Sequence, residues 1–285
     1  MKAVEIVYRC EARDTPGRPR PTSSEAARQR LNEGNRTFAA LLRGFPDEAG
    51  LIRHIVPVDP REFGLLADEA SRPPQHPFAA ILGCSDARVP VELVFGEGPN
   101  DLFVVRVAGN GLGHEVLGSL KYAMEHLRGS LKLVVVLGHS GCGALTGAVD
   151  IFLNPSDYLS LATQHSLRNI LDRLLAVVQA SAQKLVATFG SDIIGSPGYR
   201  KALIEAATVT NAALTAYSIQ QELITRDSAE MQAVYGTYLI ETREVWTPQT
   251  GAGLSVPPGD AAGFLALGDA IAKSERIASH IAANG

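Results

Sequence analysis

The chain has 285 residues, 46% of them hydrophobic, which is enough to bury a substantial core as one large domain or as one domain with appended segments. Its formal net charge of -4 gives no sequence-wide reason to bind nucleic acid or an anionic membrane, so neither is an expected partner. The apolar stretches stop far short of the roughly 20 residues that cross a bilayer, and the first residues lack the apolar core of a signal peptide. We therefore expect a soluble, cytoplasmic protein.

The chain begins with a proline-containing, charged segment over residues 1–22, which predicts an extended N-terminal arm. Thr22 followed by Glu25 fits a capping box, and apolar residues then recur at helical spacing as far as Gly44. A helix is therefore predicted over 23–43, so that the N-terminal part of the fold is a helical arm.

Three short apolar runs predict buried strands at 78–83, 102–107 and 133–137. Apolar residues at helical spacing predict a helix over 114–128, between the second run and the third. Strands that are apolar on both faces and alternate with helices imply a parallel sheet with helices packed over it. The predicted fold class is α/β, with a central, mainly parallel β-sheet flanked by helices.

The second half of the chain is predicted to be largely helical, over 142–153 and about 165–225, with breaks at Gly190 and at the turn 195–198. A strand pair over 233–240 and 243–247 follows, and an amphipathic helix is predicted near 260–282. The resulting division is an extended arm over 1–22, a main domain over 23–248, and a linker with a last helix over 249–285.

Two of the three cysteines closely follow predicted buried strands, and a histidine accompanies them. Cys84 follows the first strand, while His139 and Cys142 follow the third. The carboxyl ends of parallel strands meet at one edge of an open α/β sheet, so these side chains are expected to lie together. Thiolate and imidazole are preferred zinc ligands, and three protein ligands leave a fourth tetrahedral position open, as in catalytic sites. We predict one Zn²⁺ per subunit at these three residues.

Asp86 and Arg88 lie just after Cys84 and form a second candidate group. A guanidinium at that spacing can hold the carboxylate bidentately and keep it ionised. We expect this dyad to orient or gate a zinc-bound hydroxide that acts as the nucleophile. Two thiolates cancel the formal charge of zinc, so its water should be less acidic than at an all-histidine site, where the pKa is about 7. Activity should then rise through mildly alkaline pH.

These segments resemble those of a known family. The segments Cys84–Arg88 and His139–Gly143 are similar to the zinc-site motifs of the β-class carbonic anhydrases. Further motifs follow in family order over roughly residues 25–248: Leu31–Asn35 with Phe38, Gln75–Pro77, Phe103–Asn110, Tyr122–Ala123 and Tyr235–Tyr238. Several independent motifs in one order are more specific than any one of them.

The resemblance implies reversible hydration of carbon dioxide to bicarbonate and a proton, with zinc at the three ligands and Asp86 and Arg88 as the catalytic dyad. It further implies that Gln75 donates a hydrogen bond to bound bicarbonate. Phe103, Tyr122 and Gly143 are implied to line the small substrate pocket, part of which faces across a dimer interface. Members are dimers or multiples of dimers, so self-association as a dimer or tetramer is expected, and 23–248 is expected to be the catalytic domain.

Several alternatives stay open. Hydrolysis of carbonyl sulfide or carbon disulfide on the same scaffold is the main one, because the same nucleophile could attack either. A zinc-stabilised binding protein without catalysis would more commonly supply a fourth Cys or His. A dithiol redox protein using Cys84 and Cys142 would lack the usual C-x-x-C pair. Gln75 as a loop residue, and Phe103 and Tyr122 as plain packing residues, are simpler interpretations of those positions.

Overall fold

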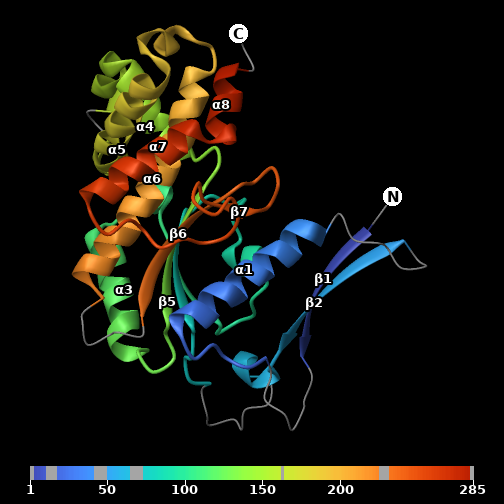
Figure 1. Cartoon of the computed structure of the whole chain (residues 1–285). Coiled ribbons are helices and arrows are strands. Elements are labelled where there is room, and N and C mark those ends of the chain that lie inside the picture. The colour runs from blue at the N-terminus through green and yellow to red at the C-terminus, as the bar shows by residue number, and fades with distance from the viewer. Residues whose placement is uncertain are drawn as a thin grey trace.

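A five-stranded sheet forms the centre of the molecule (Figure 1). The computed structural model describes residues 3–10, 18–41, 50–64, 73–161, 164–224 and 231–282. The strands are β3 (Ala79–Gly83), β4 (Leu102–Arg106), β5 (Leu133–His139), β6 (Gln232–Tyr238) and β7 (Val245–Trp246), in the order β4-β3-β5-β6-β7. The first four run parallel and β7 is antiparallel to β6. The predicted mainly parallel sheet is confirmed.

Helices cover both faces of this sheet, because its central strands are apolar on both sides. Ala80 and Leu82 of β3 belong to one buried cluster, which also takes residues of the long helices. Ala79 and Ile81 belong to the other, with residues from the N-terminal part of the chain. The first face is covered by α3 (His114–His126), α4 (Gly143–Leu153), α5 (His165–Phe189) and α6 (Tyr199–Glu222), and the second by α1 (Ser24–Ala40) and α2 (Val91–Phe95).

Helix α1 begins one residue later than the capping-box pattern suggested. Its N-cap is Ser23, whose hydroxyl accepts a hydrogen bond from the backbone N–H of Ala26, in place of Thr22. The helix then passes so close to α2 that a Cβ added at Gly34 would lie 1.8 Å from the carbonyl oxygen of Phe95. Glycine at that position therefore sets how closely α1 approaches α2.

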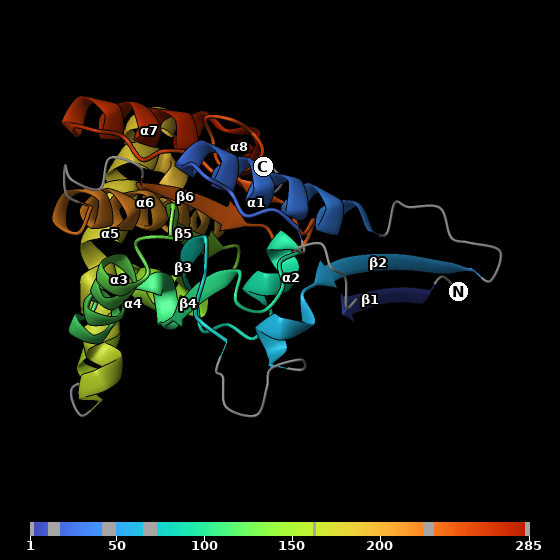
Figure 2. The same ribbon diagram turned by 90° about the horizontal axis from the view of Figure 1, so that it is seen from below.

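The N-terminal segment forms a strand that the sequence analysis did not predict. Strand β1 (Ala3–Cys10) pairs in parallel with β2 (Leu51–Val58) in a separate two-stranded sheet. Figure 2 shows this sheet extending away from the five-stranded body. The short helix η2 (Pro60–Phe63) follows β2. Residues 3–10 place Val4, Ile6 and Tyr8 at alternate positions, with the charged Glu5 and Arg9 between and after them, a pattern that the prolines later in the predicted arm obscured.

Two helices stand where one was expected at the C-terminal end. Helix α7 (Ala261–Lys273) ends at Ser274, whose backbone is extended with ψ 145°, and α8 (Glu275–Ala282) begins directly after it. Lys184 of α5 pairs with Asp269 of α7 at 2.6 Å, and Arg276 of α8 pairs with Glu205 of α6 at 2.6 Å. In the part of the chain that is described, no helix combines the length and apolar character needed to cross a membrane.

Candidate metal centre

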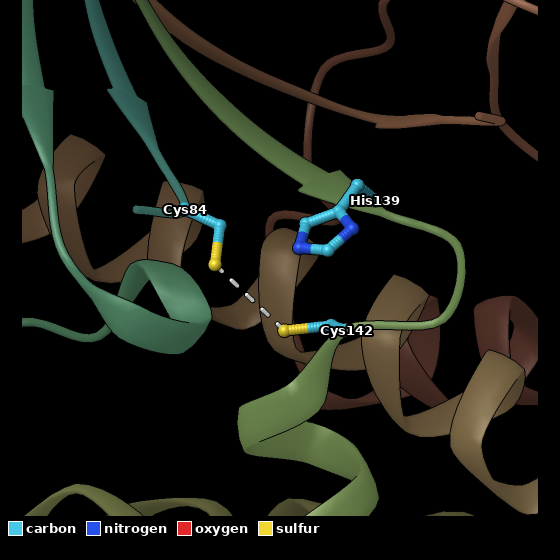
Figure 3. A group of neighbouring side chains, drawn as sticks. All are labelled: Cys84, His139 and Cys142. Carbon is cyan, nitrogen blue, oxygen red and sulfur yellow. Dashed lines mark hydrogen bonds between the residues drawn. The ribbon is translucent and has the colours of Figure 1, made fainter. Parts of the chain in front are cut away.

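The three predicted ligands converge at the carboxyl edge of the sheet (Figure 3). Cys84 directly follows β3, His139 is the last residue of β5, and Cys142 is the N-cap of α4. The side-chain donor atoms all lie within 4.8 Å of one another, with the two Sγ atoms 4.0 Å apart. All three residues are buried. Because β3 and β5 are parallel neighbours in register, their ends bring Cys84 and His139 together.

The turn between His139 and Cys142 depends on Gly141. Its φ is +62°, in the left-handed region that side-chain-bearing residues rarely adopt. The chain thereby reverses within three residues and places Cys142 at the start of α4, where the backbone N–H groups of Ala144 and Leu145 point toward its sulfur. A helix N-terminus stabilises a nearby thiolate through these N–H groups and the helix dipole.

The donors fit a zinc ion. His139 has its Nδ1 atom 3.0 Å from the carbonyl oxygen of Ser140, while its Nε2 atom is buried without a hydrogen-bond partner. An imidazole whose Nδ1–H is held by a backbone carbonyl presents Nε2 to a metal. Two sulfurs at about 2.3 Å from a tetrahedral zinc would be about 3.8 Å apart, close to the separation seen between Cys84 and Cys142.

The two thiols influence each other's protonation. The hydrogen bond between them lowers the pKa of the Cys84 thiol, and the backbone N–H of Gly109 also points at that sulfur, 3.4 Å away. The same thiol pair, together with burial, raises the pKa of Cys142. One thiolate forms readily, and the second needs a nearby positive charge, which a bound cation supplies.

The predicted dyad is formed. The Nε and Nη2 atoms of Arg88 donate to the two carboxylate oxygens of Asp86 at 2.9 and 2.7 Å, and the backbone N–H of Arg88 adds a third bond at 2.9 Å. These hydrogen bonds from Arg88 hold the pKa of Asp86 well below its usual range. Asp86 Oδ2 lies 3.8 Å from His139 Nε2, so the ionised carboxylate borders the metal position.

Two residues that the sequence analysis did not assign to the site hold its loops in place. Arg106, at the end of β4, donates to the backbone carbonyls of Cys84 and Asp86. Asn211, buried in α6, donates from Nδ2 to the carbonyl of Gly109 at 2.9 Å, and Gly109 in turn faces the Cys84 sulfur. The only sequence signal for Asn211 is a polar residue in a mostly apolar stretch of helix.

A second chain of contacts leads from the site to the C-terminal helix. Ser140, next to His139, donates from its hydroxyl to Glu241 at 2.9 Å and accepts from the backbone N–H of Ile240. Glu241 lies 3.7 Å from Arg276 of α8, which also pairs with the buried Glu205. Helix α8 is thus connected to the residue next to His139 through Glu241 and Arg276, which lie outside the sequence motifs.

Comparison with known proteins identifies the family. The family model described as "Carbonic anhydrase" matches residues 79–243, more than half of the chain. The chain belongs to the β-class carbonic anhydrase family. This stretch contains Cys84, His139 and Cys142, the Asp86–Arg88 pair and the four parallel strands β3 to β6, while β7 lies just beyond it.

Curated relatives carry the same family name over shorter stretches. Carbonic anhydrase 2 of Mycobacterium tuberculosis is 41% identical over 128 residues, which are 45% of this chain and 54% of that protein. The carbonic anhydrase of Mycolicibacterium smegmatis is 48% identical over 71 residues, 25% of this chain and 34% of that protein. The chain thus spans about half, or less, of the length of these relatives.

A solved structure also resembles the chain. It belongs to a study of two tetrameric β-carbonic anhydrases from the filamentous ascomycete Sordaria macrospora, with 22% identity, a TM-score of 0.47, and coverage of 65% of this chain and 83% of that chain.

The predicted substrate residues fall into two groups. Gly143 directly follows Cys142 and is the first residue of α4. Phe103 and Tyr122 lie 6.5 Å apart between ring centroids, near the amino end of β4 and the end of α3. Gln75 precedes β3, and Phe103 pairs with Ala80, four residues before Cys84. In one chain, Gln75, Phe103 and Tyr122 therefore lie toward the end of the sheet opposite the metal ligands.

A cavity of about 360 Å³ borders the loop after β4. It lies between that loop, the start of α3 and α5, and its lining includes Arg106, Ala108 and Arg173. None of the four predicted substrate residues belongs to this lining. Of the predicted site residues, the structure brings together the ligands, the dyad and Gly143, and it leaves the other three apart.

Proposed function

We propose that this protein catalyses the zinc-dependent, reversible hydration of carbon dioxide to bicarbonate and a proton. The observation that carries the proposal is the buried Cys84, His139 and Cys142 cluster beside an ionised Asp86, within the stretch that matches the family model. The family match favours carbon dioxide over the carbonyl sulfide or carbon disulfide alternative. We include a cytoplasmic location in the proposal, because a reducing compartment keeps both ligand thiols free.

Zinc held by the two thiolates and His139 Nε2 would supply a Lewis-acidic centre that makes a water molecule nucleophilic near neutral pH. The protein's contribution is a rigid, buried donor set. His139 is fixed through Ser140, and the Cys84 sulfur is fixed by Gly109. A single cluster of three donors supports one ion per chain, whose fourth tetrahedral position is left for water.

Asp86 is proposed to orient the attacking water. Its carboxylate stays ionised because Arg88 holds both oxygens, and an ionised carboxylate accepts a hydrogen bond from water. The water oxygen then attacks the carbon of carbon dioxide and forms the new C–O bond, the electron pair of one C=O π bond moves to its oxygen, and one proton is released to solvent, which leaves bicarbonate. Arg88 also keeps the Asp86 carboxylate turned toward its guanidinium group. The same contact can therefore gate the approach of Asp86 to the metal position.

A second copy of the chain is proposed to complete the substrate pocket. In one chain, three predicted substrate residues lie at the end of the sheet opposite Cys84, His139 and Cys142: Gln75, Phe103 and Tyr122. They therefore cannot reach the metal position of their own chain, and Tyr122 is 49% exposed. A partner in a two-fold dimer can present these residues to the opposite site. Gln75 would then donate to bicarbonate, Phe103 and Tyr122 would form the apolar wall, and Gly143 would leave room beside Cys142.

A substrate comparison tests the proposal. Stopped-flow hydration of carbon dioxide and hydrolysis of carbonyl sulfide are measured on the same zinc-loaded protein, with Cys142→Ser as the ligand-deficient control. We expect fast carbon dioxide hydration that is lost in the control. Carbonyl sulfide turnover without carbon dioxide hydration, or equal activity in the control, would overturn the assignment.

A further inference from the structure

Strand β1 is the edge of a sheet that has only two strands. Within the described ranges, β2 is the only strand that pairs with it, and Figure 2 shows no ribbon beyond β1 on the side away from β2. Seven of its eight residues are exposed, including Val4, Ile6 and Tyr8 at 36%, 37% and 39%. A two-stranded sheet alone is marginally stable, and a long exposed edge with apolar residues favours pairing with another strand.

The backbone of β1 offers hydrogen-bonding groups from alternate residues. The N–H of Ala3 donates to the carbonyl of Gly50, at the start of β2. The N–H and C=O of one strand residue point to the same side, and successive residues alternate. Residues 3, 5, 7 and 9 therefore face β2, and Val4, Ile6, Tyr8 and Cys10 present their backbone groups to the open edge.

These directions restrict how a second β1 could pair. In an antiparallel pair, outward-facing residues must lie opposite outward-facing residues, so only registers that match even-numbered with even-numbered positions are allowed. Centring the two-fold axis on Val7 places Glu5, which pairs with Arg53 of its own β2 at 2.9 Å, opposite Arg9 of the other copy, so that the carboxylate lies between two guanidinium groups. Centring it on Glu5 or on Arg9 places like charges opposite each other, which is destabilising.

The register centred on Val7 also uses the strand most fully. It pairs every residue from Val4 to Cys10, with Ile6 opposite Tyr8 and Val4 opposite Cys10 as hydrogen-bonded pairs. Glu5 and Arg9 then form non-hydrogen-bonded pairs, in which the side chains approach most closely. Centring on Ile6 or Tyr8 puts Glu5 or Arg9 opposite an apolar residue. Charge and backbone direction thus select one arrangement.

We propose that β1 is an interface between two copies of this chain, which pair antiparallel about a two-fold axis at Val7 to form a four-stranded sheet. The axis is perpendicular to the sheet, so Val4, Ile6 and Tyr8 of both copies share one face and cover one another. This interface belongs to the N-terminal segment outside the family match at 79–243, and it is independent of the metal centre.

Disulfide trapping tests the register. Val4→Cys places a new thiol opposite the native, exposed Cys10 of the other copy, at a Cα separation of about 5.5 Å, within the range that a disulfide spans. The matched control is Ile6→Cys, which is equally exposed but faces Tyr8. Under mild oxidation of the zinc-loaded protein, Val4→Cys should form a covalent dimer at least about tenfold faster than the control. Adding Cys10→Ser should abolish this dimer.

Equal rates for the two cysteine variants would overturn the proposal, as would no covalent dimer from Val4→Cys while both thiols still react with a soluble thiol reagent.

A second variant tests the edge directly. Ile6→Pro removes an outward N–H and leaves the ladder with β2 intact. The mass of the assembly, measured by light scattering, should fall relative to wild type; an unchanged mass would contradict pairing at this edge.

Discussion

At the scale of single residues, the proposed role of the Asp86–Arg88 contact is what would separate a reactive centre from one that only binds metal. Arg88 contributes three of the hydrogen bonds that orient and ionise the carboxylate, yet it is not one of the metal donors. Loss of the guanidinium should therefore affect the proposed reaction far more than zinc content.

Arg88→Ala is expected to lower kcat/KM for carbon dioxide hydration by about 100-fold, as for loss of a positioned proton acceptor. Zinc content, measured by atomic emission, should stay near that of the wild type. Arg88→Lys is the matched control: it keeps the charge but loses the two-pronged geometry, so it should restore only part of the rate. Retained turnover in Arg88→Ala would refute the role of the dyad.

The charge of the two cysteine ligands sets the expected pH dependence. A water activated beside two thiolates should have a pKa above the value of about 7 found at all-histidine zinc sites, so activity should rise between roughly pH 6.5 and pH 9. Asp86 adds no break in this range, because its pKa is lowered and its ionised state is lost only as the pH falls far into the acid range. A stopped-flow profile that is flat across this interval would contradict the account.

The sequence predicted those site residues whose chemistry lies in short local patterns. Cys84, Asp86, Arg88, His139 and Cys142 fall in two segments, and strand ends bring them together. Asn211 could not be predicted, because it acts through a backbone carbonyl 102 positions away along the chain. A contact of this kind depends on how α6 packs, which periodicity does not specify.

At the scale of elements, α6 is the helix whose packing reaches the metal centre. It packs against β5 and β6 and is buried along most of its length. Asn211 uses this position to hold Gly109, and Gly109 holds the Cys84 sulfur. The helix is therefore expected to affect metal affinity without contributing a ligand.

Asn211→Leu should lower the free energy of unfolding by about 1–3 kcal/mol, because a buried carbonyl loses its donor. It should also weaken zinc binding by roughly tenfold, as for loss of an outer partner of a ligand. Thr210→Val is the control: Thr210 bonds the carbonyl of Ala206 within its own helix, so it should cost stability without changing affinity. Chelator competition measures the affinity, and equal affinities in both variants would contradict the prediction.

Helices and strands were predictable from the sequence where a single pattern of apolar residues extends over the whole element. The buried strands and the long helices were found close to their observed bounds, because each is a continuous apolar run or a long amphipathic repeat. Strands β1 and β2 and the five-residue α2 were missed. Strand β1 is mostly exposed, the apolar residues of β2 are interrupted by Arg53, His54 and Pro57, and α2 is too short to show a period. The break at Ser274 was also missed, because Ser alone does not end a helix.

At the scale of the whole molecule, the proposed pocket needs residues from two copies of the chain. Gln75, Phe103 and Tyr122 lie toward one end of the central sheet and the ligands lie at the other. This separation follows from the strand directions within one chain. The sequence motifs alone give no sign of it.

Co-expression of two inactive variants tests the shared site. In a dimer of one Cys142→Ser chain and one Gln75→Ala chain, the intact ligand set of the second would meet the intact Gln75 of the first. Random pairing should then restore about one quarter of the wild-type carbon dioxide hydration, although each variant alone is inactive or nearly so. Activity no higher than the mean of the two parents would place the whole pocket within one chain.

The proposed function requires that Cys84, His139 and Cys142 hold a zinc ion at which carbon dioxide is hydrated. Stopped-flow carbon dioxide hydration during titration of the metal-free protein with zinc tests this claim most directly. We predict a rate that rises in proportion to added zinc and reaches its plateau at one ion per chain. A rate that is independent of zinc, or that stays at the uncatalysed level when the site is filled, would contradict it.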